Sequence, residues 1–183
     1  ALRGRLAGAI AKKFDQTVLF GPAPGTGFDT LASVATVDLS AGVYDGLVDA
    51  VTDVAAANGE LTSWVLNGQG EALVLRATDS TGRPLFLSNL QSEVALLGRP
   101  AYKSRHVTAG DDTVGFAGDW PSAVYGMVEG ISVTESSEAT ITDSDGTVLN
   151  LWQRNMFAIR AEVEIGFAVR DDARFVRLIE GGS

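Results

Sequence analysis

The chain has 183 residues, 45% of them hydrophobic, which is enough for one ordinary domain or for two small lobes that share a core. This composition excludes an intrinsically disordered protein, and no segment approaches the roughly 18 consecutive apolar residues of a membrane-spanning helix, so we expect a soluble protein. Fourteen basic and 23 acidic residues give a net charge of -9, which disfavours nucleic-acid binding, and the absence of cysteine excludes disulfides and thiolate metal sites.

The first predicted element is an amphipathic helix over residues 2–18. Leu2, Leu6, Ile10 and Phe14 repeat every four residues, and the Pro/Gly-rich segment 21–27 cannot continue a helix. Because this pattern starts at the first residue, which is not methionine, we expect a truncated or processed chain.

A second helix is predicted where apolar residues recur between Val43 and Val54. Ser40 is a candidate cap at its start, and Asn58-Gly59 is a left-handed stop at its end. The β-prone run 62–66 predicts a buried strand, residues 71–77 predict a short third helix, and residues 79–82 have turn chemistry. This order predicts a lobe of mixed α/β structure.

From Pro100 onward the sequence predicts strands at 101–104, 113–116, 123–128 and 131–134. The clearest pattern is a strict apolar/polar alternation within residues 156–169, which predicts one long strand with a dry and a wet face. Its expected partners are residues 131–142 and 175–179, with turns at 143–146 and 171–172.

Several residues are candidates for catalytic groups. His106 is the only histidine, and its neighbours form no catalytic signature, so we interpret it as a surface or turn residue. Glu162 and Glu164 would lie about 7 Å apart on one strand face beside Arg160, a spacing compatible with paired-carboxylate hydrolysis. The alternative is a solvated or intersubunit charged face.

Two loops superficially resemble ligand sites. Asp143, Asp145 and Gly146 resemble the start of a calcium loop, but Arg154 occupies the position that requires a glutamate. The glycines between residues 21 and 27 follow a predicted helix and lack the Gly-Lys-Ser/Thr of a phosphate-binding loop. We interpret both as turns.

The three tryptophans, Trp64, Trp120 and Trp152, are not interleaved with basic residues and are interpreted as core or interface anchors. The sequence therefore predicts no catalytic, cofactor-binding or metal-binding residue, and no enzyme.

Residues 149–169 (LNLWQRNMFAIRAEVEIGFAV) resemble the C-terminal signature of tailed-phage major capsid proteins with the Hong Kong 97 fold. Other blocks follow in the expected order over nearly the whole chain: AKKFDQTVLFGPAPGTGF, SWVLN, PLF, GRPAY, GFAGDW and AVYGMVEGISVTES. The resemblance implies an α+β fold in which an axial α/β lobe meets its copies at five- and six-fold centres. A peripheral lobe would combine a long helix with long antiparallel strands.

Mapped onto this chain, the resemblance places the axial lobe at residues 40–125 and the peripheral lobe at 1–39 and 126–183. It implies a structural subunit that assembles with copies of itself into pentamers and hexamers of a phage or prophage shell. Portal, scaffold or decoration proteins are possible further partners, with the virion as location and the host cytoplasm as the site of assembly. Some members of the family crosslink a lysine to an asparagine near the position of Asn150, but the lysine counterpart cannot be located in this sequence, so the sequence leaves crosslinking open.

Two alternatives remain at this point. An encapsulin-like compartment shell shares the implied fold but encloses cargo enzymes. A carboxylate-dependent hydrolase built on Glu162, Glu164 and Arg160 would require a concave pocket around these residues.

Overall fold

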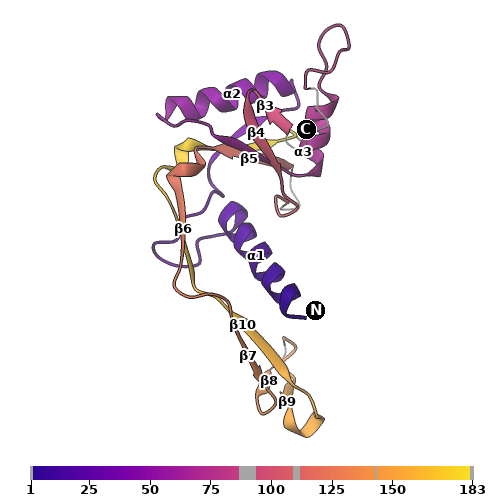
Figure 1. Ribbon diagram of the computed structural model, residues 1–183, viewed down its shortest axis with the longest axis vertical. Helices are drawn as coiled ribbons and strands as arrows, with labels where there is room; N and C mark the ends of the chain where they lie inside the picture. The colour runs from indigo at the N-terminus through magenta and orange to yellow at the C-terminus, as the bar shows by residue number, and fades with distance from the viewer. Residues whose placement is uncertain (1, 87–93, 109–111, 143, 182–183) are drawn as a thin grey trace. The chain divides into compact units, whose positions relative to one another are not determined.

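The computed structural model describes residues 2–86, 94–108, 112–142 and 144–181 (Figure 1). The chain divides into two compact units: one contains residues up to Ala11 and Gly126–Gly166, and the other contains Lys12–Tyr125 and the residues from Phe167 onward. Helices and strands are mixed, which confirms the predicted α and β content. None of the helices in the described ranges has the length and apolar character needed to cross a membrane.

A six-stranded mixed sheet forms the centre of the larger unit (Figure 1). In spatial order the strands are β1 (Ala35–Asp38), β12 (Phe175–Ile179), β5 (Thr113–Gly118), β2 (Ser63–Leu66), β4 (Arg99–Lys103) and β3 (Val94–Leu96). The pairs β1–β12 and β2–β4 are parallel, and the others are antiparallel. Because β1 and β12 come from outside residues 40–125, the sheet crosses the lobe limits drawn from the sequence.

Each face of this sheet is covered by a separate hydrophobic cluster. The helices α2 (Val43–Ala56) and α3 (Gly68–Arg76) pack on the face that carries Trp64 and Leu66. The end of α1 (Leu2–Phe20) packs with Val65 and Phe116 in the second cluster. Since successive strand residues point to opposite faces, the alternation of Trp64, Val65 and Leu66 between the clusters shows that the sheet is buried on both sides.

The helix predictions are confirmed in type, but two of their starting points are wrong. The residue that precedes α2 is Gly42, which has no side chain to cap the helix, and Ser40 lies two residues earlier, where its backbone N–H donates to the carboxylate of Asp38 at 2.8 Å. Helix α3 starts three residues before the prediction, since the side-chain oxygen of Asn67 accepts from the N–H groups of Gln69 and Gly70 at 2.9 Å. The predicted left-handed stop is confirmed by a φ of 55° at Asn58.

Six further strands form three two-stranded pairs: β6 (Ala123–Met127) with β11 (Ile165–Val169), β7 (Ser132–Ser136) with β10 (Ala158–Glu162), and β8 (Thr140–Thr142) with β9 (Val148–Asn150). Short 3-10 turns in the described residues are η1 (Trp120–Ser122), η2 (Trp152–Arg154) and η3 (Asp172–Arg174).

The prediction of a single strand over residues 156–169 is wrong in its continuity but right in its alternation. From Ile159 to Phe167 the odd positions are half-buried or buried and the even positions are exposed. The strand is interrupted at Val163 and Glu164, where the opposing segment 128–131 contributes four residues against these two. The N–H of Val128 still donates to the carbonyl of Glu164 at 3.2 Å, but the unequal number of residues disturbs the regular hydrogen-bond ladder, as a β-bulge does.

One predicted partner of the strand region 156–169 is also wrong. Residues Phe175–Ile179 pair with β5 and β1 in the central sheet instead. The predicted partner segment 131–142 is correct only for Ser132–Ser136, while β6 pairs with β11.

Candidate functional site

The carboxylates considered for hydrolysis do not form a shielded site. Arg160 makes an ion pair with Glu162, and their side chains are 73% and 53% exposed. Glu162 and Glu164 line an open hollow together with Gly130 and Ser132. Because paired-carboxylate catalysis requires one carboxyl group to be kept protonated by a shielded environment, this arrangement matches the solvated charged face better than an active site.

His106 has a definite partner that the sequence did not indicate. Its Nδ1 contacts a carboxylate oxygen of Asp15 on α1, although the two residues are 91 positions apart. The hydroxyl of Ser104 accepts from the backbone N–H of His106 at 3.2 Å, so this hydrogen bond does not involve the imidazole ring. The histidine thus ties the loop after β4 to α1, and this contact does not resemble a nucleophile–base pair.

The two loops that resembled ligand sites act as turns. Gly27 has a φ of 84°, which lets the chain reverse after α1. Asp145 accepts from the backbone N–H of Thr147 at 2.8 Å, and this hydrogen bond lowers the pKa of Asp145 below its ordinary value. Asp143 lies outside the described residues. Across the described ranges, no three His, Asp or Glu side chains gather closely enough to hold a metal ion.

The tryptophans divide into two core anchors and one exposed side chain. The indole N–H of the fully buried Trp64 donates to the carbonyl of Leu96 at 3.0 Å. That of Trp120 donates to Ser63 at 3.0 Å, while its ring meets Phe175 edge-on at 5.4 Å between centroids. Trp152 is 72% exposed and remains available for contact with another molecule.

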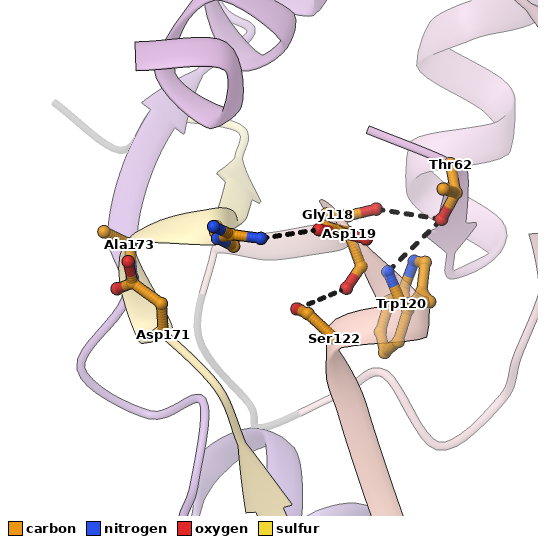
Figure 2. Close-up of polar contacts among 8 residues, drawn as sticks. Thr62, Gly118, Asp119, Trp120, Ser122, Asp171 and Ala173 are labelled. Carbon is orange, nitrogen blue, oxygen red and sulfur yellow. Dashed lines mark hydrogen bonds and ion pairs between the residues drawn. The ribbon is translucent and has the colours of Figure 1, made fainter. Parts of the chain in front are cut away.

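A half-buried polar corner, which sequence reasoning missed, fixes the chain where β5 ends (Figure 2). Arg174 donates to the carboxylate of Asp119 at 3.2 Å, with side chains only 17% and 14% exposed. Figure 2 shows the Thr62 hydroxyl between Gly118, whose carbonyl accepts from it at 3.3 Å, and Trp120, whose N–H donates to it at 3.2 Å. No local pattern signals this corner, because Asp119 and Arg174 are 55 positions apart.

The segment 126–166 has almost no core of its own. Among its described residues, Leu151 alone is buried, whereas eight large apolar side chains are exposed: Met127, Val128, Ile131, Ile141, Val148, Trp152, Met156 and Phe157. Two-stranded hairpins are marginally stable in water, and exposed apolar side chains that gather in one patch are typical of surfaces that contact other proteins. Asn150 in this segment accepts from the N–H of Gln153 at 3.3 Å and so has a local structural role.

Comparison with known proteins identifies the class that this architecture represents. The chain belongs to the Phage capsid family, which matches residues 1–179. It is 30% identical over 200 residues to the probable major capsid protein gp17 of Mycobacterium phage D29, covering 99% of this chain and 63% of that protein. It is 31% identical over 198 residues to the corresponding protein of Mycobacterium phage L5, covering 97% and 60%. The chain thus spans less than two thirds of these relatives.

Solved structures share the fold. A chain of Gordonia phage Cozz matches with a TM-score of 0.74 and 22% identity, covering 98% of this chain and 62% of that chain. A chain of Mycobacterium phage Ogopogo matches with a TM-score of 0.76 and 20% identity, covering 98% and 67%. The capsid of an empty GTA particle matches with a TM-score of 0.65 and 19% identity, covering 99% and 64%. The resemblance to tailed-phage major capsid proteins is confirmed by the family match and by these relatives, both of which are described as phage capsid proteins and not as hydrolases.

Proposed function

We propose that this chain is the shell-forming part of a major capsid subunit with a Hong Kong 97-type fold. Copies would assemble into pentamers and hexamers of an icosahedral phage or prophage shell that encloses the genome. Many modest contacts between copies add up to a stable shell, so no single interface needs to be strong. Portal, scaffold and decoration proteins are further partners in this proposal.

The two compact units suggest how the lobes divide. The unit built around the six-stranded sheet corresponds to the axial lobe, with β1 and β12 added to residues 40–125. The strand pairs within residues 126–166 correspond to the peripheral lobe. In this proposal the apolar side chains exposed in that segment become buried between copies.

The observation that carries the proposal is the family match over residues 1–179. The test is electron microscopy of the full-length gene product after expression and purification. Polyhedral particles are expected, and a protein that stays monomeric at high concentration would contradict the proposal. Neighbouring terminase, portal and protease genes would support a genome-enclosing shell, whereas a neighbouring peroxidase or ferritin-like gene would indicate a compartment.

A further inference from the structure

Charge is distributed very unevenly along the chain. Residues 14–75 contain eight acidic residues and no lysine or arginine, whereas residues 76–105 contain five basic residues and two acidic ones. Both segments lie in the larger unit. Three of the exposed acidic residues lie on α2, whereas the exposed residues Arg76, Lys103 and Arg105 lie at the end of α3, at the end of β4 and in the loop after β4.

The acidic region is the outer surface of α2. Asp45, Asp49 and Asp53 are exposed and follow one another every four residues, which places them along one side of the helix. The apolar side chains Tyr44 and Val48 lie beside them and are 47% and 39% exposed. We call these five residues the acidic face.

The acidic face is unfavourable for an isolated chain. Like charges four residues apart destabilise a helix, and Asp53 lies in the last turn, where the helix dipole favours a cation. In the described parts of the chain, none of the three carboxylates forms an ion pair; Arg174, near the end of α2, is paired with Asp119. A neighbouring molecule that supplies cations would offset both the repulsion among the three aspartates and the unfavourable position of Asp53 in the helix dipole.

The basic region adjoins a small, mostly apolar hollow between α3 and β4. The hollow is lined by Leu66, Glu71, Val74, Leu75, Ala101, Tyr102 and Lys103. Arg76 follows Leu75 at the end of α3, and Arg105 lies two residues beyond Lys103; both arginines are exposed. Lys103 contacts Glu71 but remains 59% exposed. We call Leu75, Arg76, Tyr102, Lys103 and Arg105 the basic face.

The two faces lie toward opposite ends of the sheet. Helix α2 packs on β1 and β12, and its Gly46 approaches the backbone of Asp38 so closely that an added Cβ would lie 3.0 Å from the Asp38 carbonyl. Helix α3 packs on β5 and β2, and β4 lies beyond β2. Three strand spacings of about 4.8 Å separate β12 from β4, roughly 14 Å in all, so the faces of one chain do not meet across the sheet.

We propose that the acidic face of one copy docks on the basic face of the next copy, with Tyr44 and Val48 against the apolar hollow. This inference rests on the proposed function and names the residues of one contact within it. The contact is heterologous, because two different surfaces meet, and a repeated heterologous contact forms a ring when the rotation from one copy to the next closes after a whole number of copies. Charge complementarity fixes the direction of the contact, and the apolar residues bury surface at its centre.

The first test uses the absence of cysteine from these 183 residues, with any cysteine elsewhere in the full-length protein replaced by serine. Tyr44→Cys and Tyr102→Cys are introduced together into the full-length protein, which is then treated with a short bismaleimide. A ladder of covalent multimers is expected from the double variant and none from either single variant. Dimers from a single variant would show that like surfaces meet and would overturn the proposal. Particles from the double variant without any ladder would also overturn it.

The second test exchanges the charges. Asp49→Lys with Asp53→Lys should reduce particle yield at least roughly tenfold, since like charges would then face each other. Adding Arg76→Glu and Arg105→Glu to the same chain should restore most of the yield, because each chain supplies both faces. Equal yields from wild type and the double reversal, or no rescue by the fourfold variant while its circular dichroism remains native, would refute the docking. Failure of the wild type to form particles would count against the proposed function, and crosslinking in concentrated solution would still report on the contact.

Discussion

Replacing Trp64 with phenylalanine tests whether this indole anchors the core between the sheet and its two helices. Trp64 is fully buried, and its N–H donates to the carbonyl of Leu96 at 3.0 Å. Loss of this hydrogen bond costs about 1 kcal/mol, and loss of three buried ring atoms adds roughly 1–2 kcal/mol of transfer and cavity free energy. The free energy of unfolding should therefore fall by about 2–3 kcal/mol, equivalent to roughly 4–12 °C in Tm for a chain of this size.

The assay is urea denaturation followed by far-UV circular dichroism, which does not depend on tryptophan fluorescence. The matched control is Trp152→Phe, because Trp152 is 72% exposed and its replacement should change stability by less than about 0.5 kcal/mol. If both variants lost the same small amount of stability, the role assigned to Trp64 would be wrong. If both lost several kcal/mol, Trp152 would be buried in solution, contrary to the structure.

Three further predictions give the direction in which stability should change. Gly46→Ala should destabilise the chain, although alanine favours helices by about 1 kcal/mol, because the added Cβ would lie 2.6 Å from a methyl of Leu39. Its control is Gly8→Ala in α1, which should stabilise the chain because the added Cβ would have no atom within 4 Å. Equal urea midpoints for the two variants would contradict this reasoning. Asn58→Ala should cost roughly 1 kcal/mol because Asn58 has a φ of 55°, whereas Asn58→Gly should be neutral or stabilising in the same assay. Hydrogen bonds from Ser40 and Gly181 hold the pKa of Asp38 below its ordinary 3.8, so its stabilising contribution is complete above that pH and is lost as pH falls through the lowered pKa. Urea midpoints of wild type should therefore fall more steeply on acidification than those of Asp38→Ala, and parallel profiles would argue against this contact.

The strand region 156–169 shows which features a sequence pattern can predict and which it cannot. Its strand conformation and its dry and wet faces were predictable, because the alternation from Ile159 to Phe167 is a local property of an extended backbone. Its interruption at Val163 and Glu164 was not, because it arises from the two extra residues in the opposing segment 128–131. The same division holds for the candidate site. The sequence allowed a solvated charged face for Glu162 as one of two alternatives, whereas no local pattern indicated the contact of His106 with Asp15.

The sequence by itself determined the helices, the left-handed stop at Asn58, the alternating strand and, through its resemblance, the capsid family. Tertiary structure decided that Phe175–Ile179 joins β5 and β1, that Asn67 starts α3 while also donating to Val107 and Thr113, and that Asp119 meets Arg174. Helical and strand periods are fixed by backbone geometry over a few residues and so appear in the sequence. Pairing between segments 40 or more positions apart depends on which surfaces best fit and exclude water together, and only the folded chain reveals that choice.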